Sequence, residues 1–461
     1  MKLIPVYSWN KTRLHFSKSS LRHLADQPWF QGVLLLVSVI VAMLLANLPA
    51  TKVLYHEILE TQVTLHMVSP EYHIDSAFPR DMNIEKLIND ILMVIFFFTV
   101  GLEIKREVAY GELSSAKKAM LPVIAAFGGV IFPALIYFFI NNGTPAASGW
   151  GIPTATDIAF AVCILSALGD RVPVSMKVFL TALAIADDLI AILVVAIFYG
   201  GSINFVLLGI ALALILVALL MRKTGEKHMV PYLLIAFCIW VLFYYGGIHA
   251  TMAGVVMAFV IPNRPVFGKD ETLQRLEAAE AAFHSYHGIE SGMGFPAGPQ
   301  RHYMREMKKA IDGSMNMSYK LERALSPWVN YLIMPLFALA NAGVEISGGA
   351  GFGTAGLGIV LGLMLGKPLG ITIFSAIAIK LGVGEKPAGT SWAMFFAVAC
   401  LGGIGFTMSI FVDTLSFGDQ LPAVMEGLRA SGKIAVLLGS VCSAVLGSLL
   451  VTFVSAISRK K

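Results

Sequence analysis

Long apolar runs separated by short polar stretches make up most of the chain. Many of these runs are about 20 residues long, which is the length that crosses a bilayer as α-helix. The alternation of polar and apolar positions that is typical of outer-membrane strands is missing. The pattern predicts twelve spanning helices: Phe30–Leu48, Ile88–Val108, Ala119–Ile140, Gly151–Gly169, Ser175–Tyr199, Asn204–Met221, Val230–Gly246, His249–Pro262, Pro327–Glu345, Thr354–Lys380, Ser391–Asp413 and Gly432–Ser455.

Composition supports a membrane protein. The 461 residues are 57% hydrophobic and 14% charged, and the mean hydropathy is +0.75. Soluble domains carry about 25% charged residues, so this chain departs far from them. We therefore expect an all-α polytopic membrane protein, folded as one domain over residues 1–461 and embedded in a lipid bilayer.

The distribution of positive charge sets an expected orientation. If both termini are cytoplasmic, that side of the membrane carries 28 of the 34 Lys and Arg residues, and the opposite side carries five. This asymmetry follows the positive-inside rule. The basic segment 1–29 is too long for the first part of a secretory signal, so we expect a cytoplasmic tail followed by an uncleaved first helix.

Two connections between the spans are long. The segment 49–87, expected outside, contains a β-prone stretch, Gln62–Ile74, whose Ser-Pro pair could turn a hairpin. The segment 263–326, expected inside, holds two charged helix-like stretches around a Gly/Pro-rich break at Gly292–Gly298. It is interpreted as a solvated cytoplasmic insertion, and a regulatory element stays open as the alternative.

The sequence lacks the motifs of several other functional classes. The four cysteines are scattered through apolar spans without C-x-x-C spacing, which disfavours disulfides and metal sites. No HExxH, Walker-type phosphate loop or GxSxG occurs. We expect no enzyme activity, no cofactor and no nucleic-acid partner.

Charged residues inside the spans carry the candidate chemistry. Asp187 and Asp188 lie near the middle of the fifth span, and Lys367 lies near the middle of the tenth. Each such charge costs about 2.5 to 3.5 kcal/mol even on a lenient insertion scale, so these residues usually line a pathway. A buried salt bridge that only joins helices is the alternative, but it would leave the adjacent second acid without a partner.

The start of the fourth span, GIPTATD, is unusual for a helix that faces lipid. If Ile152–Thr156 are extended, Asp157 reaches about 20 Å into the membrane, against about 9 Å for a helix. Such backbone is tolerated only where it is buried in protein or lines a cavity. The alternative is that Asp157 caps a helix near the interface.

The eleventh span repeats this feature, with three glycines between Gly402 and Gly405. Spans 3–5 and 10–12 then form two triplets of opposite orientation, and each triplet has an interrupted middle helix. Paired interruptions of this kind indicate inverted-topology repeats around a transport site. Half-helix ends there expose partial charges, which Asp157 and Lys367 could offset.

Together the motifs TATDIAFA, ALAIADDLIAI, LGKPLGI, CLGGIGFTMSI, GLEIKREV and GGIHATMAGVV resemble the NhaA-type sodium/proton antiporters, from about Phe30 to the last span. Inverted repeats with broken helices are described for this same family, so the triplets and the resemblance are not independent. The resemblance implies two broken, crossing helices, spans 4 and 11. It also implies electrogenic exchange of Na⁺ or Li⁺ for H⁺ across the bacterial inner membrane, activated at alkaline pH and serving sodium and pH homeostasis.

The same resemblance implies roles for single residues. The cation site is expected at Asp187 and Asp188, with charge compensation by Asp157 and Lys367 and with Thr156 beside them. Contacts between the 49–87 loops would form a homodimer. A set linked to pH response is expected at Glu103, Arg106, Glu107, His249 and Glu322.

Two hypotheses from other classes of function stay open. A sodium-coupled organic solute symporter shares broken helices and inverted repeats, but it would need room for a solute at the crossing. An intramembrane aspartyl protease could pair Asp157 with Asp187. It would carry a Gly-x-Gly-Asp signature, which is absent, and would have no use for Lys367.

Overall fold

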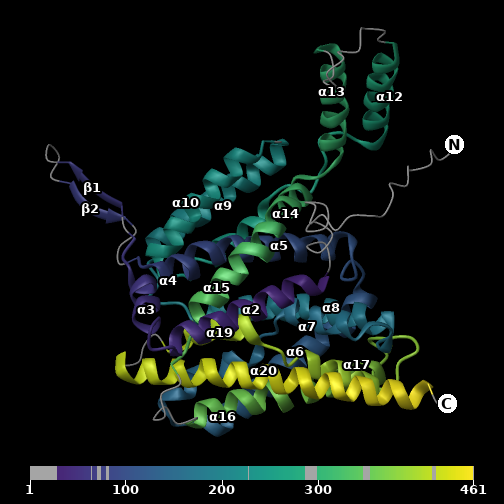
Figure 1. Ribbon diagram of the computed structural model, residues 1–461. Helices are drawn as coiled ribbons and strands as arrows, with labels where there is room; N and C mark the ends of the chain where they lie inside the picture. The colour runs from purple at the N-terminus through teal and green to yellow at the C-terminus, as the bar shows by residue number, and fades with distance from the viewer. Residues whose placement is uncertain are drawn as a thin grey trace, which may run out of the picture.

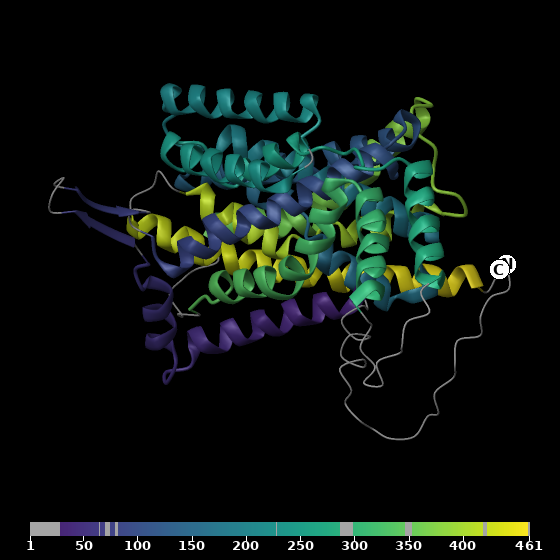
Figure 2. The same cartoon turned by 90° about the horizontal axis from the view of Figure 1, so that it is seen from above.

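A computed structural model describes residues 28–63, 65–69, 74–78, 82–226, 228–285, 298–345, 353–417 and 422–459. Most of the helices form a bundle whose longest member is α20, and a β-hairpin and a helical hairpin project from opposite ends of it (Figures 1 and 2). The part of the bundle that precedes the helical hairpin contains α2 Pro28–Asn47, α3 Lys52–Glu60, α4 Ile84–Lys86, α5 Met93–Tyr110, α6 Ala116–Asn141, α7 Ile158–Ala167, α8 Val174–Phe198, α9 Phe205–Thr224, α10 Met229–Gly246 and α11 Met252–Val260.

The remaining helices include several with local changes of winding. The α-helices are α12 Lys269–Ser285, α13 Gly298–Ser314, α14 Met317–Trp328, α15 Met334–Asn341, α16 Gly353–Leu361, α17 Lys367–Lys380, α18 Trp392–Leu401, α19 Phe406–Ser416 and α20 Pro422–Arg459. The 3₁₀ segments are η2 Pro145–Thr154 and η3 Gly169–Arg171. The π-helical segments are η1 Leu87–Leu92, η4 Val329–Ile333 and η5 Gly362–Gly366.

The membrane-spanning character predicted from the apolar runs is confirmed. Among the described residues, eight helices are long and apolar enough to cross a bilayer, or up to ten if each bent pair counts as one span. Two predicted spans fall outside this count. The span expected at His249–Pro262 has only the short helix α11, and the span expected at Pro327–Glu345 lies in the continuous helix α14–η4–α15. The number twelve therefore stays a prediction.

Both helices expected to be interrupted are bent. Segments η2 and α7 meet at 44°, and α18 and α19 meet at 54°. The first interruption differs in detail from the expectation, because Pro145–Thr154 is 3₁₀-helical and only the residues from Ala155 to Asp157 are extended. The chain therefore enters the fourth span at Pro145, before the predicted start at Gly151.

Helices from the two triplets pack tightly, and α6 lies along α17. Gly128 and Gly370 allow this approach, since a Cβ on Gly128 would lie 2.3 Å from the carbonyl oxygen of Gly370 and a Cβ on Gly370 would lie 2.0 Å from that of Gly128. Small residues let membrane helices come this close. The contact holds α17, which begins with Lys367, against the first triplet.

The β-hairpin occupies part of the 49–87 loop. Strands β1 Leu65–Ser69 and β2 Ile74–Phe78 pair antiparallel, with Leu65 opposite Phe78 and Ser69 opposite Ile74. The Ser-Pro turn expected after Ser69 lies outside the described residues. Within the 263–326 segment, α12 and α13 cover the two helix-like stretches and pack against each other. The predicted Gly/Pro-rich break at Gly292–Gly298 lies outside the described residues, except for Gly298, where α13 begins.

Candidate ion-binding site

Lys367 is the most deeply buried charged residue at the point where the two bent helices cross. Its side chain is fully buried, and its Nζ contacts Asp187 Oδ2 and donates to Thr156 Oγ1. An ammonium group without partners would be very costly in this position. Asp187 supplies the opposite charge, so the α17–α8 contact depends on a dry ion pair.

Thr156 connects three elements at this point. Its hydroxyl lies 2.5 Å from Asp187 Oδ2 and 2.8 Å from the carbonyl oxygen of Gly402. A hydroxyl has a single proton, so it can donate fully to one of these acceptors at a time. Through this side chain, the break in the η2–α7 helix contacts both α8 and the break in the α18–α19 helix.

Asp157 contacts the N-terminal ends of two half-helices. Its Oδ1 accepts from the backbone N–H of Phe160 at 3.2 Å, which caps α7. Its Oδ2 accepts from the backbone N–H of Thr407 at 3.1 Å and from the Thr407 hydroxyl, which caps α19. One carboxylate thus meets the positive ends of two half-helices. Asp157 is a helix cap, as one interpretation held, but it is buried at the crossing and not near the interface.

The backbones of the two breaks are also joined directly. The backbone N–H of Asp157 donates to the carbonyl oxygen of Ile404 at 2.7 Å. Extended backbone exposes groups that a helix would satisfy internally, and here each break provides partners for the other. The crossing therefore behaves as one hydrogen-bonded unit.

Asp188 lies beside this unit with the least engaged carboxylate. Both Asp187 and Asp188 are 2% exposed, and the Oδ1 atoms of both are buried without a hydrogen-bond donor among the described residues. Carboxylate oxygens are the ligands that hard cations prefer. Two such oxygens on adjacent residues can receive either a proton or a small cation.

A second charged group, which we call the Arg106 cluster, joins α5 to α14. Arg106 contacts Glu322, lies 3.1 Å from Glu107 Oε1, and lies 3.7 Å from Glu103 Oε1. The arginine is 39% exposed. Burial is the main cause that raises the pKa of Glu322 above its ordinary value; Arg106 opposes the rise, and Glu103 and Glu107 add to it. Four of the five residues expected to respond to pH are therefore in contact.

His249 is separate from this cluster. Its Nδ1 lies 2.7 Å from the Thr251 hydroxyl, and its ring packs edge-on against Phe411 at 5.7 Å between centroids. The histidine therefore adjoins α19, the second half of the bent helix. Its contacts with Thr251 and Phe411 do not include Glu322.

Sequence reasoning missed two partners at the crossing and one buried lysine. Thr407 and the Gly402 carbonyl both lie in the CLGGIGFTMSI motif, but nothing in the pattern shows which atoms face Asp157 or Thr156. Lys105 donates to the carbonyl oxygens of Ala258, Phe259 and Ile261 at the end of α11. A cation at a helix C-terminus is favourable, and this one closes a short helix.

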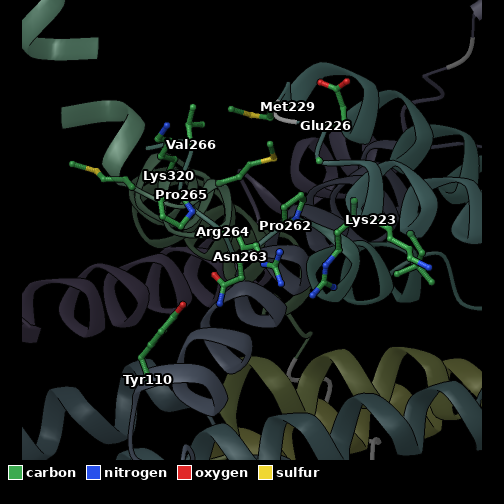
Figure 3. Close-up of a pocket in the computed structure, with 15 residues that line it drawn as sticks. Tyr110, Lys223, Glu226, Met229, Pro262, Asn263, Arg264, Pro265, Val266 and Lys320 are labelled. Atoms are coloured by element: carbon green, nitrogen blue, oxygen red, sulfur yellow. The ribbon is translucent and has the colours of Figure 1, made fainter. Parts of the chain in front are cut away.

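A cavity of about 660 Å³ lies apart from the crossing. Its lining includes Tyr110, Arg222, Lys223, Arg264 and Lys320, which come from the ends of α5 and α9, from the segment after α11 and from α14 (Figure 3). None of the acids at the crossing lines this cavity. Cavity size therefore would not have located the candidate site.

Comparison with known proteins finds one matching family and relatives that bear the same name. The family described as Na⁺/H⁺ antiporter 1 matches residues 22–451. The chain is 42% identical over 376 residues to the Na(+)/H(+) antiporter NhaA of Syntrophobacter fumaroxidans, covering 80% of this chain and 78% of that protein. It is 39% identical to the namesake of Bacteroides thetaiotaomicron, covering 96% and 99% of the two chains, and 40% identical to that of Helicobacter pylori, covering 93% and 94%.

Proposed function

Because this chain belongs to the Na⁺/H⁺ antiporter 1 family, a family of transporters, we propose that it is a secondary active, electrogenic antiporter that exchanges Na⁺ or Li⁺ for protons. It sits in the bacterial inner membrane with both termini cytoplasmic, and it extrudes sodium from the cell. Its role is sodium and pH homeostasis.

The observation that carries the proposal is the pair of buried acids at the crossing. Asp187 and Asp188 are adjacent and buried, and in the described segments each has one oxygen without a hydrogen-bond donor. Two like charges in a site of low dielectric disfavour each other's ionisation. Lys367 can neutralise one carboxylate, so the second needs a proton or a cation.

Exchange follows from this competition. When the site opens to an alkaline cytoplasm, the carboxylates release protons and a dehydrated Na⁺ binds between their oxygens. Movement of the crossing then opens the site to the outside, where protons displace the cation. The same residues cannot hold a cation and protons at once. Transport of Na⁺ in one direction therefore requires transport of protons in the other.

Lys367 accounts for the electrogenic stoichiometry. In the structure it holds Asp187, and cation binding to Asp187 must break or weaken that contact. The freed ammonium group can then release a proton. Coupled groups of this kind titrate as a unit, so the extra proton belongs to the Lys367–Asp187–Asp188 group and not to one member. More protons then enter than cations leave.

The Arg106 cluster supports activation at alkaline pH. Burial raises the pKa of Glu322, so this carboxyl is neutral at lower pH and ionises as the cytoplasmic pH rises. Ionisation strengthens its contact with Arg106. We assign Glu103, Arg106, Glu107 and Glu322 to pH sensing, with His249 as a separate contributor beside Phe411.

The β-hairpin supports a homodimer. A two-stranded hairpin alone is marginally stable in water, and its outer strand edges can pair with another strand. Strands β1 and β2 project from the bundle at the end opposite to the C-terminal end of α20 (Figure 1). Contact between the 49–87 loops of two copies would cover these edges.

The test is collapse of an imposed pH gradient by Na⁺ in everted membrane vesicles, scanned from about pH 6.5 to 8.5. Wild type is compared with Asp188→Asn and with Asp170→Asn, a matched change of an exposed acid. We expect exchange that rises with pH in wild type and in Asp170→Asn and that vanishes in Asp188→Asn. Unchanged exchange in Asp188→Asn would reject the proposed site.

A further inference from the structure

Asp413 is a buried acid that the exchange mechanism above does not use. It lies in α19, it is fully buried, and neither of its carboxylate oxygens has a hydrogen-bond donor among the described residues. A dry carboxylate without donors cannot remain ionised at an acceptable energetic cost. Asp413 is therefore a buried carboxyl group that a proton can neutralise.

Charged and titratable groups surround Asp413 without bonding to it. Arg429 and Lys433 of α20 face it electrostatically, as do Tyr137 of α6 and Tyr199 of α8. Arg429 donates to the carbonyl oxygen of Thr414, and Tyr137 and Tyr199 donate to the carbonyl oxygens of Ala146 and Ser148. Glu85 lies in turn near Lys433.

These surroundings suit a carboxyl group that changes its charge. The two tyrosine hydroxyls are committed to backbone oxygens and offer no proton to Asp413. The two cations of α20 are near enough to favour the ionised form once water enters, although neither donates to the carboxylate in this conformation. The acid can therefore exchange its proton with external water when the external half of the crossing opens.

The contact with α20 depends on the absence of a side chain at Gly432. A Cβ there would lie 1.9 Å from Asp413 Oδ1 and 2.8 Å from its Cγ. The α20 backbone thus closes over the carboxyl group of Asp413. Separation of α19 from α20 at Gly432 would expose this group.

A polar stripe runs from Asp413 toward the crossing. Ser409 lies one helical turn before Asp413 on the same face of α19, since residues four apart are neighbours on a helix. The Ser409 hydroxyl is buried and has no hydrogen-bond partner in the described part of the chain. A Cβ on Gly405 would lie 2.1 Å from this hydroxyl and 3.1 Å from the carbonyl oxygen of Ala155, the residue before Thr156. Ser409 therefore lies between Asp413 and the break that holds Thr156.

Asp413 belongs to the external half of the molecule in the proposed orientation. It follows Thr407, which donates to Asp157 at the crossing, by six residues, or about 9 Å along a helix. The eleventh span runs outward in that orientation, so its second half, α19, leads from the crossing to the outside.

We propose that Asp413 is a proton-binding site on the external access route, which takes protons from external water and passes them through Ser409 toward the crossing. The inference rests on the proposed antiport function. An external hydronium ion protonates the Asp413 carboxylate. Asp413 and Ser409 are not hydrogen-bonded to each other in this conformation, so water that enters on opening joins them. The Ser409 hydroxyl then accepts a proton from Asp413 through this water while it releases its own toward Asp187 and Asp188, so protons are conserved at each step.

The test separates the two sides of the membrane. Right-side-out vesicles expose the external face to the bath, and everted vesicles expose the cytoplasmic face. For Asp413→Asn we expect the external proton concentration at half-maximal Na⁺ efflux to rise about tenfold, equivalent to one pH unit. The cytoplasmic pH profile and the Na⁺ concentration at half-maximal rate should stay within about twofold of wild type.

Two serine variants act as a milder probe and its control. Ser409→Ala should shift the external profile in the same direction, by about threefold. Ser416→Ala should leave it unchanged, because that hydroxyl donates to its own helix at Val412. If Asp413→Asn fails to accumulate in the membrane, Ser409→Ala still decides the outcome.

Three results would overturn the proposal. An external profile of Asp413→Asn identical to wild type would make Asp413 a structural acid. Equal shifts on both sides, or loss of Na⁺ binding, would make it part of the cation site or of the fold. An unchanged Ser409→Ala profile would remove the relay. Failure of the antiport function itself would differ from all of these, because wild-type vesicles would then show no exchange.

Discussion

Two clusters of opposite charges join helices in this molecule, and they differ in their access to water. At the crossing, Lys367 and Asp187 are 1% and 3% exposed in their side chains. In the Arg106 cluster, Arg106 is 39% exposed and contacts three acids. The first pair carries a balanced charge in a dry site. The second cluster carries an excess of acid, and its arginine reaches water although Glu322 is buried.

The difference in access to water decides which function each cluster suits. In a dry site, removing one charge leaves its partner uncompensated, so a change of occupant forces a change of structure. Near water, the same loss is screened and adjusts only the balance of the cluster. The crossing is therefore suited to obligatory exchange, and the Arg106 cluster is suited to graded regulation.

The largest effect that we predict is on stability. Lys367→Ala leaves Asp187 buried without its cation, and we expect a loss of about 3 to 5 kcal/mol in the free energy of unfolding. Arg106→Ala, the matched change in the other cluster, should cost less than about 1 kcal/mol. Denaturant unfolding of the purified protein in detergent measures both.

The double variant Lys367→Ala/Asp187→Ala controls the interpretation of that result. Removing both charges should recover part of the stability, because no unpaired charge is then buried. Equal losses for Lys367→Ala and Arg106→Ala would erase the distinction between the dry and the wet cluster.

A smaller effect is expected at the helix caps. Asp157→Ala removes the acceptor for the N-termini of α7 and α19, and we predict a loss of about 1 to 2 kcal/mol. Asp157→Asn keeps a capping oxygen, so it should lose less stability than the alanine variant. Thermal unfolding of both variants tests this order, and a larger loss for Asn would contradict the capping role.

The next effect concerns pH and leaves peak exchange intact. Burial holds the pKa of Glu322 above its ordinary value, so the neutral form persists to higher pH. Glu322→Gln fixes a neutral side chain and should move the activation profile to higher pH by about one unit or less. Rates across the pH scan test this, and loss of exchange at every pH would contradict it. Arg323→Gln, one residue away, is the matched control.

The smallest effect is predicted from salt. Raising the ionic strength with choline chloride, which neither cluster should bind, shortens the range of charge interactions to a few ångströms. The pH profile should shift by a few tenths of a unit through the exposed Arg106 cluster, while the Na⁺ affinity of the crossing stays unchanged. Equal salt dependence of both quantities would show that the two clusters are not separated by access to water.

Much of the site could be predicted from the sequence because its charges stand out in apolar surroundings. Asp187, Asp188 and Lys367 are costly in a membrane, and the glycine and proline residues mark where the fourth and eleventh helices bend. The sequence left a buried salt bridge at these residues open as an alternative, and the structure shows Lys367 in contact with Asp187. Four members of the pH-response set also meet, as the family resemblance implied.

The rest depends on three-dimensional packing. Thr407 is one of several polar residues in its motif, and only the crossing geometry brings it to Asp157. Asp413 is the last residue of the span predicted at Ser391–Asp413. The structure continues α19 to Ser416 and covers Asp413 with the Gly432 backbone. Apolar pattern cannot show how far a helix continues or what packs over it.

The mechanism requires that a cation and protons compete for the same carboxylates, and calorimetry of Na⁺ binding measures this competition. Titrations of the purified protein near pH 8 in buffers of different ionisation enthalpy give the number of protons released per Na⁺ bound. We predict release of about one to two protons in wild type and no detectable Na⁺ binding in Asp188→Asn. Na⁺ binding without proton release, or release that persists in Asp188→Asn, would contradict the claim.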